Sequence, residues 1–281
     1  VNEMIAWFGI TETKKIAMAF NKRPKIDLRV NTLKTTMKDC LEIFQKNNID
    51  VEPINKLANG LVLKSKPRSI RELPGYLEGK WLIQDRSSQW VAPLLSPIKG
   101  DKILDACAAP GTKTTHLAQL IKDDGEIIAI DRSDLRLKLL KENLERLDIK
   151  SVKFLKIDAT KLLDIKPEYI NYFDKILIDA PCSGLGTLAR NPDARWKITK
   201  ETISQLKNIQ EKLLETLLPL LKKNGLLVYS TCTICPTENN LLIEKFLKKN
   251  NKLKLIFEKQ ILPNCDDAGD GFYAAIISHE K

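Results

Sequence analysis

Residues 101–120 read DKILDACAAPGTKTTHLAQL, a short apolar run followed by a turn of small residues and then by a helical pattern. The same alternation continues downstream. The predicted strands are GEIIAID, SVKFLKID, FDKILIDAP and GLLVYSTC, and the predicted helices span 112–121, 133–147, part of 199–223 and 237–249. Strands that alternate with helices of this length form right-handed βαβ units on a parallel sheet. The pattern predicts an α/β, Rossmann-like domain, with LKLIFE and GFYAAIIS as a hairpin at the sheet edge.

The part of the chain before this domain has a different pattern. Short predicted strands and one helix are separated by Asn-Gly and Pro-Gly turns; the strands span 26–33, 49–54, 60–64 and 80–84, and the helix spans 36–47. This pattern is typical of a small α+β unit. We expect a domain boundary near Ser96-Pro97, with one domain over 1–96 and the other over 97–281.

Composition excludes several classes of protein. The 281 residues are 43% hydrophobic and 29% charged, which is globular and neither disordered nor fibrous. No apolar run approaches the roughly 18 residues of a membrane span, and the first twenty residues lack the features of a signal peptide. We therefore expect a cytoplasmic protein that makes no contact with a membrane.

The six cysteines are scattered, so free thiols are expected. Only Cys232 and Cys235 have the spacing of metal ligands, and His116 and His279 are the sole histidines. Because no second half of a zinc site is present, we expect no metal.

The positive charge lies mainly in the first third of the chain. Residues 1–100 contain 17 basic and 10 acidic side chains (17 − 10 = +7), and the remainder contributes 29 − 26 = +3. Such a bias suits a polyanionic partner such as RNA, because each phosphate contact releases counterions. Solvated surface lysines would give the same count, and charge alone leaves both explanations open.

Four predicted strands of the α/β domain end in acidic residues: Asp105, Asp131, Asp158 and Asp179. Ligands bind at the carboxyl ends of such strands. The turn after the first strand has the single Gly111 and lacks the G-x-G-x-x-G pattern, which disfavours a dinucleotide. S-adenosylmethionine fits better, with Asp131 on the ribose hydroxyls, Asp158 on the adenine amine and the first turn on the methionine moiety.

Two cysteines follow neighbouring predicted strands. Cys182 lies after a proline and Cys232 after a threonine, so both thiols should face one crevice. Methylation of carbon 5 of a pyrimidine requires a thiolate, because that carbon becomes nucleophilic only after a thiolate adds to carbon 6. One cysteine would attack, and the other would help to resolve the adduct.

The segments DACAAPGTKTTHLAQL, IDAPCSGLGTLARNPDARW and YSTCTICPTENN resemble motifs of the RNA 5-methylcytosine methyltransferases of the Nop/Sun type. RVNTLK, ELPGYLEGKWLIQDRSSQW and DGFYAAII extend the resemblance over nearly the whole chain. It implies the class I S-adenosylmethionine-dependent fold with a seven-stranded, mostly parallel sheet, preceded by an RRM-like RNA-binding subdomain. It also implies methylation of a cytosine, with 16S ribosomal RNA as the expected substrate.

The resemblance assigns roles to the candidate residues. Cys232 is the implied nucleophile and Cys182 the implied assistant in product release. Asp179, near the target base, and Lys113 complete the catalytic set. The implied cofactor contacts are Cys107, Ala108, Ala109, Pro110, Gly111, Thr112, Lys113, Asp131, Arg136, Asp158 and Asp179.

Arg29, Arg190 and Arg195 are candidates for contacts to RNA phosphates, and Trp196 either stacks on a base or anchors a loop. The family pattern has a second glycine where this chain has Thr112, and it includes an upstream NusB-like domain. We expect a monomeric catalytic fragment without that domain. Three alternatives remain: a transfer RNA substrate, a non-catalytic ribosome assembly factor, and a redox protein that uses Cys232 and Cys235.

Overall fold

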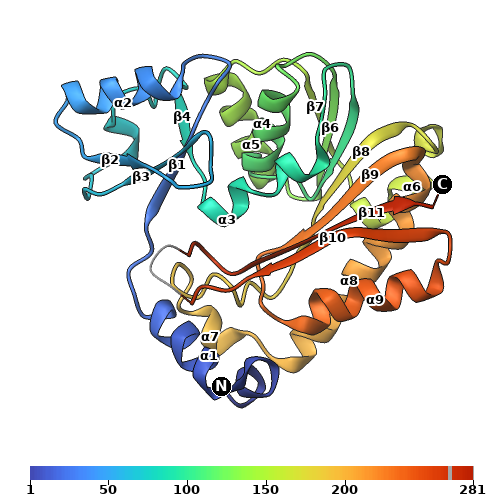
Figure 1. Ribbon diagram of the computed structural model, residues 1–281. Coiled ribbons are helices and arrows are strands. Elements are labelled where there is room, and N and C mark those ends of the chain that lie inside the picture. Colours follow the sequence, from blue (N-terminus) through green and yellow to red (C-terminus); the bar gives the residue numbers. More distant parts are fainter. Residues whose placement is uncertain (265–267, 281) are drawn as a thin grey trace.

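The computed structural model describes residues 1–264 and 268–280, and its larger part is built on one twisted sheet (Figure 1). The strand order is β10-β11-β9-β8-β5-β6-β7, in which β5 to β9 run parallel and β11 pairs antiparallel with both of its neighbours, β9 and β10. The strands are β5 (Lys102–Ala106), β6 (Glu126–Asp131), β7 (Val152–Lys156), β8 (Phe173–Asp179), β9 (Leu221–Thr231), β10 (Leu253–Ile261) and β11 (Phe272–His279). The predicted α/β class and the seven-stranded, mostly parallel sheet are confirmed.

Helices cover both faces of this sheet (Figure 1). One face carries α4 (Thr112–Leu120) and α5 (Asp134–Leu147), and the other carries α6 (Leu162–Ile165), α8 (Lys200–Leu217) and α9 (Asn240–Lys249). Ile103 of β5 packs in the core with Leu117, whereas the next residue, Leu104, packs in the opposite core with Leu214. Burial on both faces explains why the central strands read as continuous apolar runs.

A second, four-stranded antiparallel sheet precedes the large one. Its order is β2 (Val51–Pro53), β3 (Gly60–Leu63), β1 (Ile26–Val30) and β4 (Trp81–Ile83). Helix α2 (Met37–Lys46) starts with a capping box formed by Thr36 and Asp39. It covers one face of this sheet, where Phe44 of the helix packs in one core with Leu28 of β1 and Trp81 of β4. The boundary near Ser96-Pro97 stays a prediction.

Four α-helices were not expected from the sequence: α1 (Asn2–Phe20), α3 (Arg86–Gln89), α6 and α7 (Ala194–Lys197). Helix α1 kinks at Gly9, where φ is +75°. Only Thr13, Ile16 and Phe20 of α1 are buried, and the last two pack on Leu188 and Ile234. An apolar stripe this short gives little helical periodicity, so its sequence pattern is weak.

The tail strands pair as the sequence suggests. β10 and β11 form an antiparallel hairpin, and β11 pairs with β9, so β10 is the edge strand. Among the described helices, none has both the length and the apolar character needed to cross a bilayer.

Arg29 corrects an expectation. Its side chain leaves β1 on the face opposite α2, is 1% exposed, and reaches the start of α4. The guanidinium donates hydrogen bonds to the Thr112 carbonyl oxygen (2.7 Å), Thr115 Oγ1 (2.9 Å), Gln119 Oε1 (3.1 Å) and Gln84 Oε1. Burial lowers the pKa of Arg29 to about 9. A guanidinium enclosed in this way cannot reach an RNA phosphate; it joins the small sheet to the large domain.

We expect Arg29→Ala to lower the free energy of unfolding by about 3 kcal/mol, because four acceptors, three of them in buried contacts, lose their donor at once. Urea denaturation measures the change. Arg23→Ala, which removes an exposed guanidinium just before β1, should stay within about 0.5 kcal/mol of wild type. Equal effects of the two substitutions would show that Arg29 does not hold the two parts together.

Candidate active site

The loops after β5, β6, β7, β8 and β9 meet at the carboxyl edge of the sheet and enclose two adjoining cavities. The larger has a volume of about 430 Å³, and its wall includes Lys113, Asp179, Cys182, Cys232 and Phe272. The smaller is lined by Asp131, Asp158 and neighbouring residues. Cys107, Arg136 and Pro181 line both cavities, so the two are neighbours.

The two thiols lie side by side in the wall of the larger cavity. β8 and β9 pair in parallel with Asp179 opposite Ser230, which places Cys182 and Cys232 at the ends of adjacent strands. Their Sγ atoms are 3.3 Å apart and are not joined in a disulfide. The hydrogen bond to Cys232 and burial hold the pKa of Cys182 well above its usual range. The pair can therefore share one proton.

An ion pair lies beside the thiols. Lys113 Nζ of α4 is 2.7 Å from Asp179 Oδ2, and Ser230 Oγ donates to Asp179 Oδ1 at 3.1 Å. Lys113 is 7% exposed and lies 5.0 Å above the ring of Phe272. The pair presents one donor and one acceptor to the cavity, which suits a polar heterocycle.

The turn after β5 is held in a fixed conformation. Cys107 and Gly111 have positive φ values of +61° and +96°, and a Cβ on Gly111 would lie 2.2 Å from Leu140 Cδ1. Ala109 N donates to Asp131 Oδ2 at 3.2 Å, and Arg136 donates to the Ala109 carbonyl oxygen. The turn therefore depends on both α5 and the end of β6.

The residues predicted to hold the cofactor fall into two groups. Cys107, Thr112, Lys113, Asp131, Arg136, Asp158 and Asp179 line the cavities. Ala108, Ala109, Pro110 and Gly111 line neither cavity and instead shape the turn. Their roles in binding stay predictions.

The third thiol of the site, Cys107, differs from the other two. Burial first, and then the charges of Asp131 and Asp179, raise its pKa to about 12. A thiol that keeps its proton to so high a pH is a poor nucleophile.

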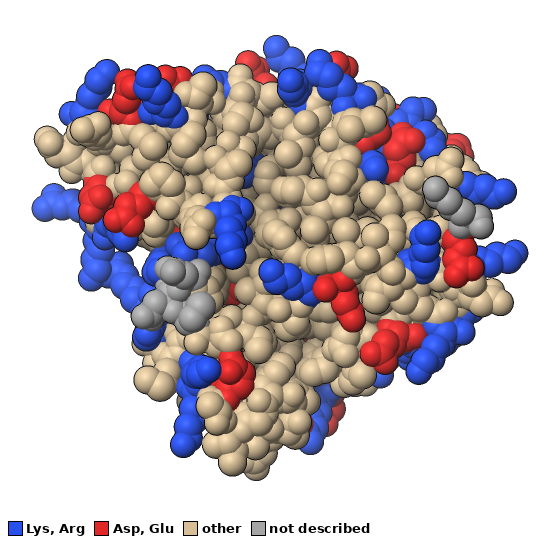
Figure 2. Space-filling model, viewed as in Figure 1, with Lys and Arg blue, Asp and Glu red and all other residues tan. Residues whose placement is uncertain are grey.

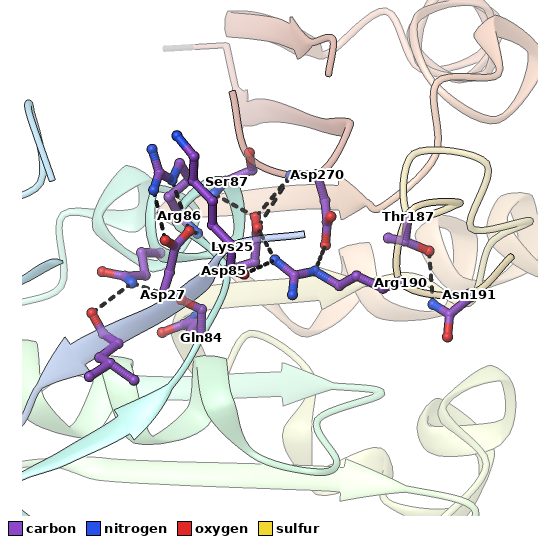
Figure 3. Close-up of polar contacts among 12 residues, drawn as sticks. Lys25, Asp27, Gln84, Asp85, Arg86, Ser87, Thr187, Arg190, Asn191 and Asp270 are labelled. Atoms are coloured by element: carbon purple, nitrogen blue, oxygen red, sulfur yellow. Dashed lines mark hydrogen bonds and ion pairs between the residues drawn. The ribbon is translucent and has the colours of Figure 1, made fainter. Parts of the chain in front are cut away.

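Arg190 lies between two carboxylates at the outer wall of the larger cavity (Figure 3). Its Nε donates to Asp270 Oδ2 at 2.7 Å and its Nη2 to Asp85 Oδ2 at 2.8 Å. Burial and the charge of Asp85 raise the pKa of Asp270 to about 7. Arg190 thus ties the loop that follows Cys182 to the loop before β11, and its charge is paired within the protein.

Sequence reasoning assigned no role to Asp85 or Asp270. Both lie in segments that carry the family resemblance, DRSSQW and DGFYAAII, and each is an acidic residue next to a strand. That signal is weak without knowledge of which loops meet, since an acidic residue beside a strand is usually a cap or a solvated side chain.

Arg195 and Trp196 lie on the short helix α7. Arg195 donates to the Phe20 carbonyl oxygen (2.7 Å) and Asn21 Oδ1 (3.0 Å), so it secures the end of α1. Trp196 is 86% exposed and anchors no packing in this structure. Contacts of Arg190, Arg195 and Trp196 with RNA stay predictions. On the face in Figure 2, Lys and Arg side chains are spread widely and alternate with Asp and Glu.

The second cysteine of the Cys232–Cys235 pair lies apart from the cavity. Cys235 is 1% exposed, and its Sγ is 3.2 Å from Thr237 Oγ1. Cys232 instead contacts the thiol of Cys182. This contact does not favour the redox alternative, in which Cys232 would act together with Cys235. Over residues 1–264 and 268–280, no cluster of three or more His, Cys, Asp or Glu side chains could hold a metal ion.

Two family models match the chain. The model described as 16S rRNA methyltransferase RsmB/F matches residues 92–280, and one described as an RsmF/B-like methyltransferase, ferredoxin-like domain, matches residues 1–70.

The chain is similar to individual proteins along most of its length. A probable ribosomal RNA small subunit methyltransferase B from Synechocystis is 44% identical over 86% of the chain, and the match spans 54% of that relative. A solved methyltransferase homolog from Pyrococcus horikoshii is 31% identical with a TM-score of 0.84 and covers 97% of this chain and 92% of its own. The structure of NSun6 from Pyrococcus horikoshii with SFG is 25% identical, with a TM-score of 0.89 and coverage of 100% and 97%. The chain spans about half the length of the curated relative.

Gly111 offers a test of the turn. Gly111→Ala should lower the free energy of unfolding by about 3 kcal/mol. Two costs add: alanine is strained at the positive φ of this position, and its Cβ would collide with the buried side chain of Leu140. Gly100→Ala is the matched control, since φ at Gly100 is +83° and nothing lies within 4 Å of its added Cβ. We expect about 1 kcal/mol for the control in the same denaturation assay. The assignment fails if the two variants lose equal stability.

Proposed function

Because the chain belongs to the 16S rRNA methyltransferase RsmB/F family, we propose that it transfers a methyl group from S-adenosylmethionine to carbon 5 of a cytosine in 16S ribosomal RNA. The observation that carries this proposal is the pair of thiols, Cys182 and Cys232, 3.3 Å apart beside the Lys113–Asp179 ion pair. A ribosomal RNA substrate would place the activity in the cytoplasm.

The residues present fit S-adenosylmethionine. Asp131 and Asp158 line the smaller cavity, and each has carboxylate lone pairs beyond those used by its backbone donors, so they can accept from ribose hydroxyls and the adenine amine. Cys107 and Lys113 lead from there to the thiols. When bound, the cofactor would supply an electrophilic methyl group. The turn 107–113 would hold its methionine part.

The thiols would make carbon 5 reactive. A lone pair of the Cys232 thiolate forms the bond to carbon 6, and the electrons of the 5,6 double bond move toward carbon 5, which becomes nucleophilic. After methylation, loss of the proton on carbon 5 restores the double bond and releases Cys232 as a thiolate. Cys182 lies close enough to assist that release. Lys113 and Asp179 would hold the ring by hydrogen bonds.

The target base must leave its stack to reach this cavity. Extrusion costs a few kcal/mol, which contacts to the RNA backbone must offset. Exposed Arg195 and Trp196 are candidates for such contacts, Arg195 for a phosphate and Trp196 for a base. Paired Arg190 is a weaker candidate, because a phosphate would have to compete with Asp85 and Asp270.

The test compares wild type, Cys182→Ala and Cys232→Ala after incubation with unmodified 16S ribosomal RNA and labelled S-adenosylmethionine. Cys182→Ala should accumulate a protein–RNA adduct that survives a denaturing gel, because release is impaired. Cys232→Ala should form no adduct and lose methylation by more than about a thousandfold, since it lacks the nucleophile.

Cys235→Ala is the matched control, because Cys235 is buried outside the cavity, and it should retain activity. Methylation by Cys232→Ala would refute the assignment of the nucleophile. Methylation of transfer RNA in place of 16S ribosomal RNA would keep the chemistry and overturn the substrate. If wild type binds RNA and methylates neither RNA, a non-catalytic role is favoured.

A further inference from the structure

A buried polar network lies directly behind the two thiols. Ser183 follows Cys182 and Thr233 follows Cys232, and the hydroxyl oxygens of Ser183 and Thr233 are 2.8 Å apart. Glu238, in the turn after β9, accepts hydrogen bonds from Ser183 N at 2.9 Å and from the Ser183 hydroxyl. One carboxylate therefore links the residues that follow both thiols.

Glu238 is fully buried, with 0% of its surface exposed. Its third donor is the Gln210 amide of α8 at 3.0 Å, and Gln210 also donates to the Pro181 carbonyl oxygen at 2.9 Å. Two of the three donors are N–H groups, of the Ser183 backbone and the Gln210 side chain. Within the described residues, Glu238 makes no ion pair.

This arrangement differs from that of the carboxylates that line the larger cavity. Asp179 is paired with Lys113, and Asp85 and Asp270 are paired with Arg190. Asp131 lies 3.6 Å from Arg136. Each of these charges is offset by a neighbouring cation, whereas the charge of Glu238 acts on its surroundings without such compensation.

We propose that Glu238 is a positioning residue that fixes the Cys182 loop beside Cys232 and keeps the shared proton on Cys182, so that Cys232 carries the negative charge. That Cys232 then attacks carbon 6 of the base rests on the function proposed above. The order of ionisation does not, because it concerns the two thiols alone.

The physical cause is the position of the charge. Glu238 bonds the residue next to Cys182, and its negative charge disfavours a second negative charge there. The hydrogen bond to Cys232 contributes most to the raised pKa of Cys182, followed by burial and then by the charges of Cys232 and Glu238. The Gly184 N–H acts in the opposite direction.

The remaining groups around Cys182 do not reverse this order. Lys113 and Asp179 neutralise each other, as do Arg190 and its two carboxylates. Tyr229 is buried, and its pKa is held well above its usual range, first by burial and then by the charge of Cys182. A tyrosine in that state stays neutral and adds no charge.

The proton balance needs no further reactant. When the pair loses one proton to water, the S–H that remains donates to the thiolate across 3.3 Å. When the Cys232 lone pair forms a bond to an electrophile, Cys182 keeps its proton. The reaction therefore uses one negative charge, which lies on the sulfur of Cys232.

The first experiment measures the alkylation of each thiol by iodoacetamide between pH 6 and about 11, with mass spectrometry of the peptides that contain Cys182 and Cys232. In wild type, Cys232 should be alkylated with the lower midpoint pH. The reverse order would overturn the proposal. This measurement requires no variant at Glu238 and remains decisive if that variant fails to fold.

The second experiment isolates the charge of Glu238 in the Cys232→Ser background, where Cys182 has no thiolate beside it. Adding Glu238→Gln should lower the midpoint pH for Cys182 by about one unit, because the shape is kept and the charge is lost. Ser183→Ala in the same background keeps the charge of Glu238 and removes one of its hydrogen bonds. It should therefore not lower the midpoint pH for alkylation of Cys182. An unchanged midpoint in the Glu238→Gln variant would refute the electrostatic role.

Glu258→Gln is the matched control for loss of a carboxylate. Glu258 of β10 accepts a hydrogen bond from the Tyr273 hydroxyl at 2.7 Å and does not line either cavity at the strand ends. It should not move the Cys182 midpoint. Neither titration uses RNA or a methyl donor, so failure of the proposed function and failure of this inference are distinguishable.

Discussion

The parallel pairing of β8 with β9 is the constraint on which the site depends. That pairing sets Asp179 opposite Ser230, and the chain leaves both strands within three residues to place Cys182 and Cys232 at a sulfur–sulfur distance of 3.3 Å. No local interaction could bring together two residues that lie 50 positions apart. The packed cores on both faces of the sheet fix the register, because a shift by one residue would exchange the side chains of a strand between the two cores.

Electrostatic pairing organises the rest of the cavity. Lys113 meets Asp179, and Arg190 meets Asp85 and Asp270, so most charges near the thiols are balanced before any ligand arrives. Balanced charges in a half-buried cavity reduce the reorganisation that accompanies a reaction. Against this background, the unbalanced carboxylate of Glu238 distinguishes one sulfur from the other, and the two cysteines become chemically unequal.

Arg29 shows how residue type alone can mislead. In the sequence it is a basic residue in a basic segment, and an RNA contact is the natural prediction. Alternation along β1 instead directs Leu28 and Val30 into the core under α2 and turns Arg29 toward α4, where it is buried. Helix α1 escaped prediction for a related reason, because few of its side chains are buried and its apolar pattern is short.

The sequence by itself determined the α/β class, the order of the strands and the longer helices in the large domain, and the acidic and thiol residues at the strand ends. Period-two and helical patterns, and the rule that ligands bind at the carboxyl edge of a parallel sheet, are local signals that a single chain carries. Only the tertiary structure decided which loops meet. Arg190 pairs with Asp85 and Asp270, buried Arg29 bonds Gln84 and Thr115, and Glu238 bonds Ser183; each of these five contacts joins residues 55 to 105 positions apart. Such contacts arise from packing that no short segment encodes.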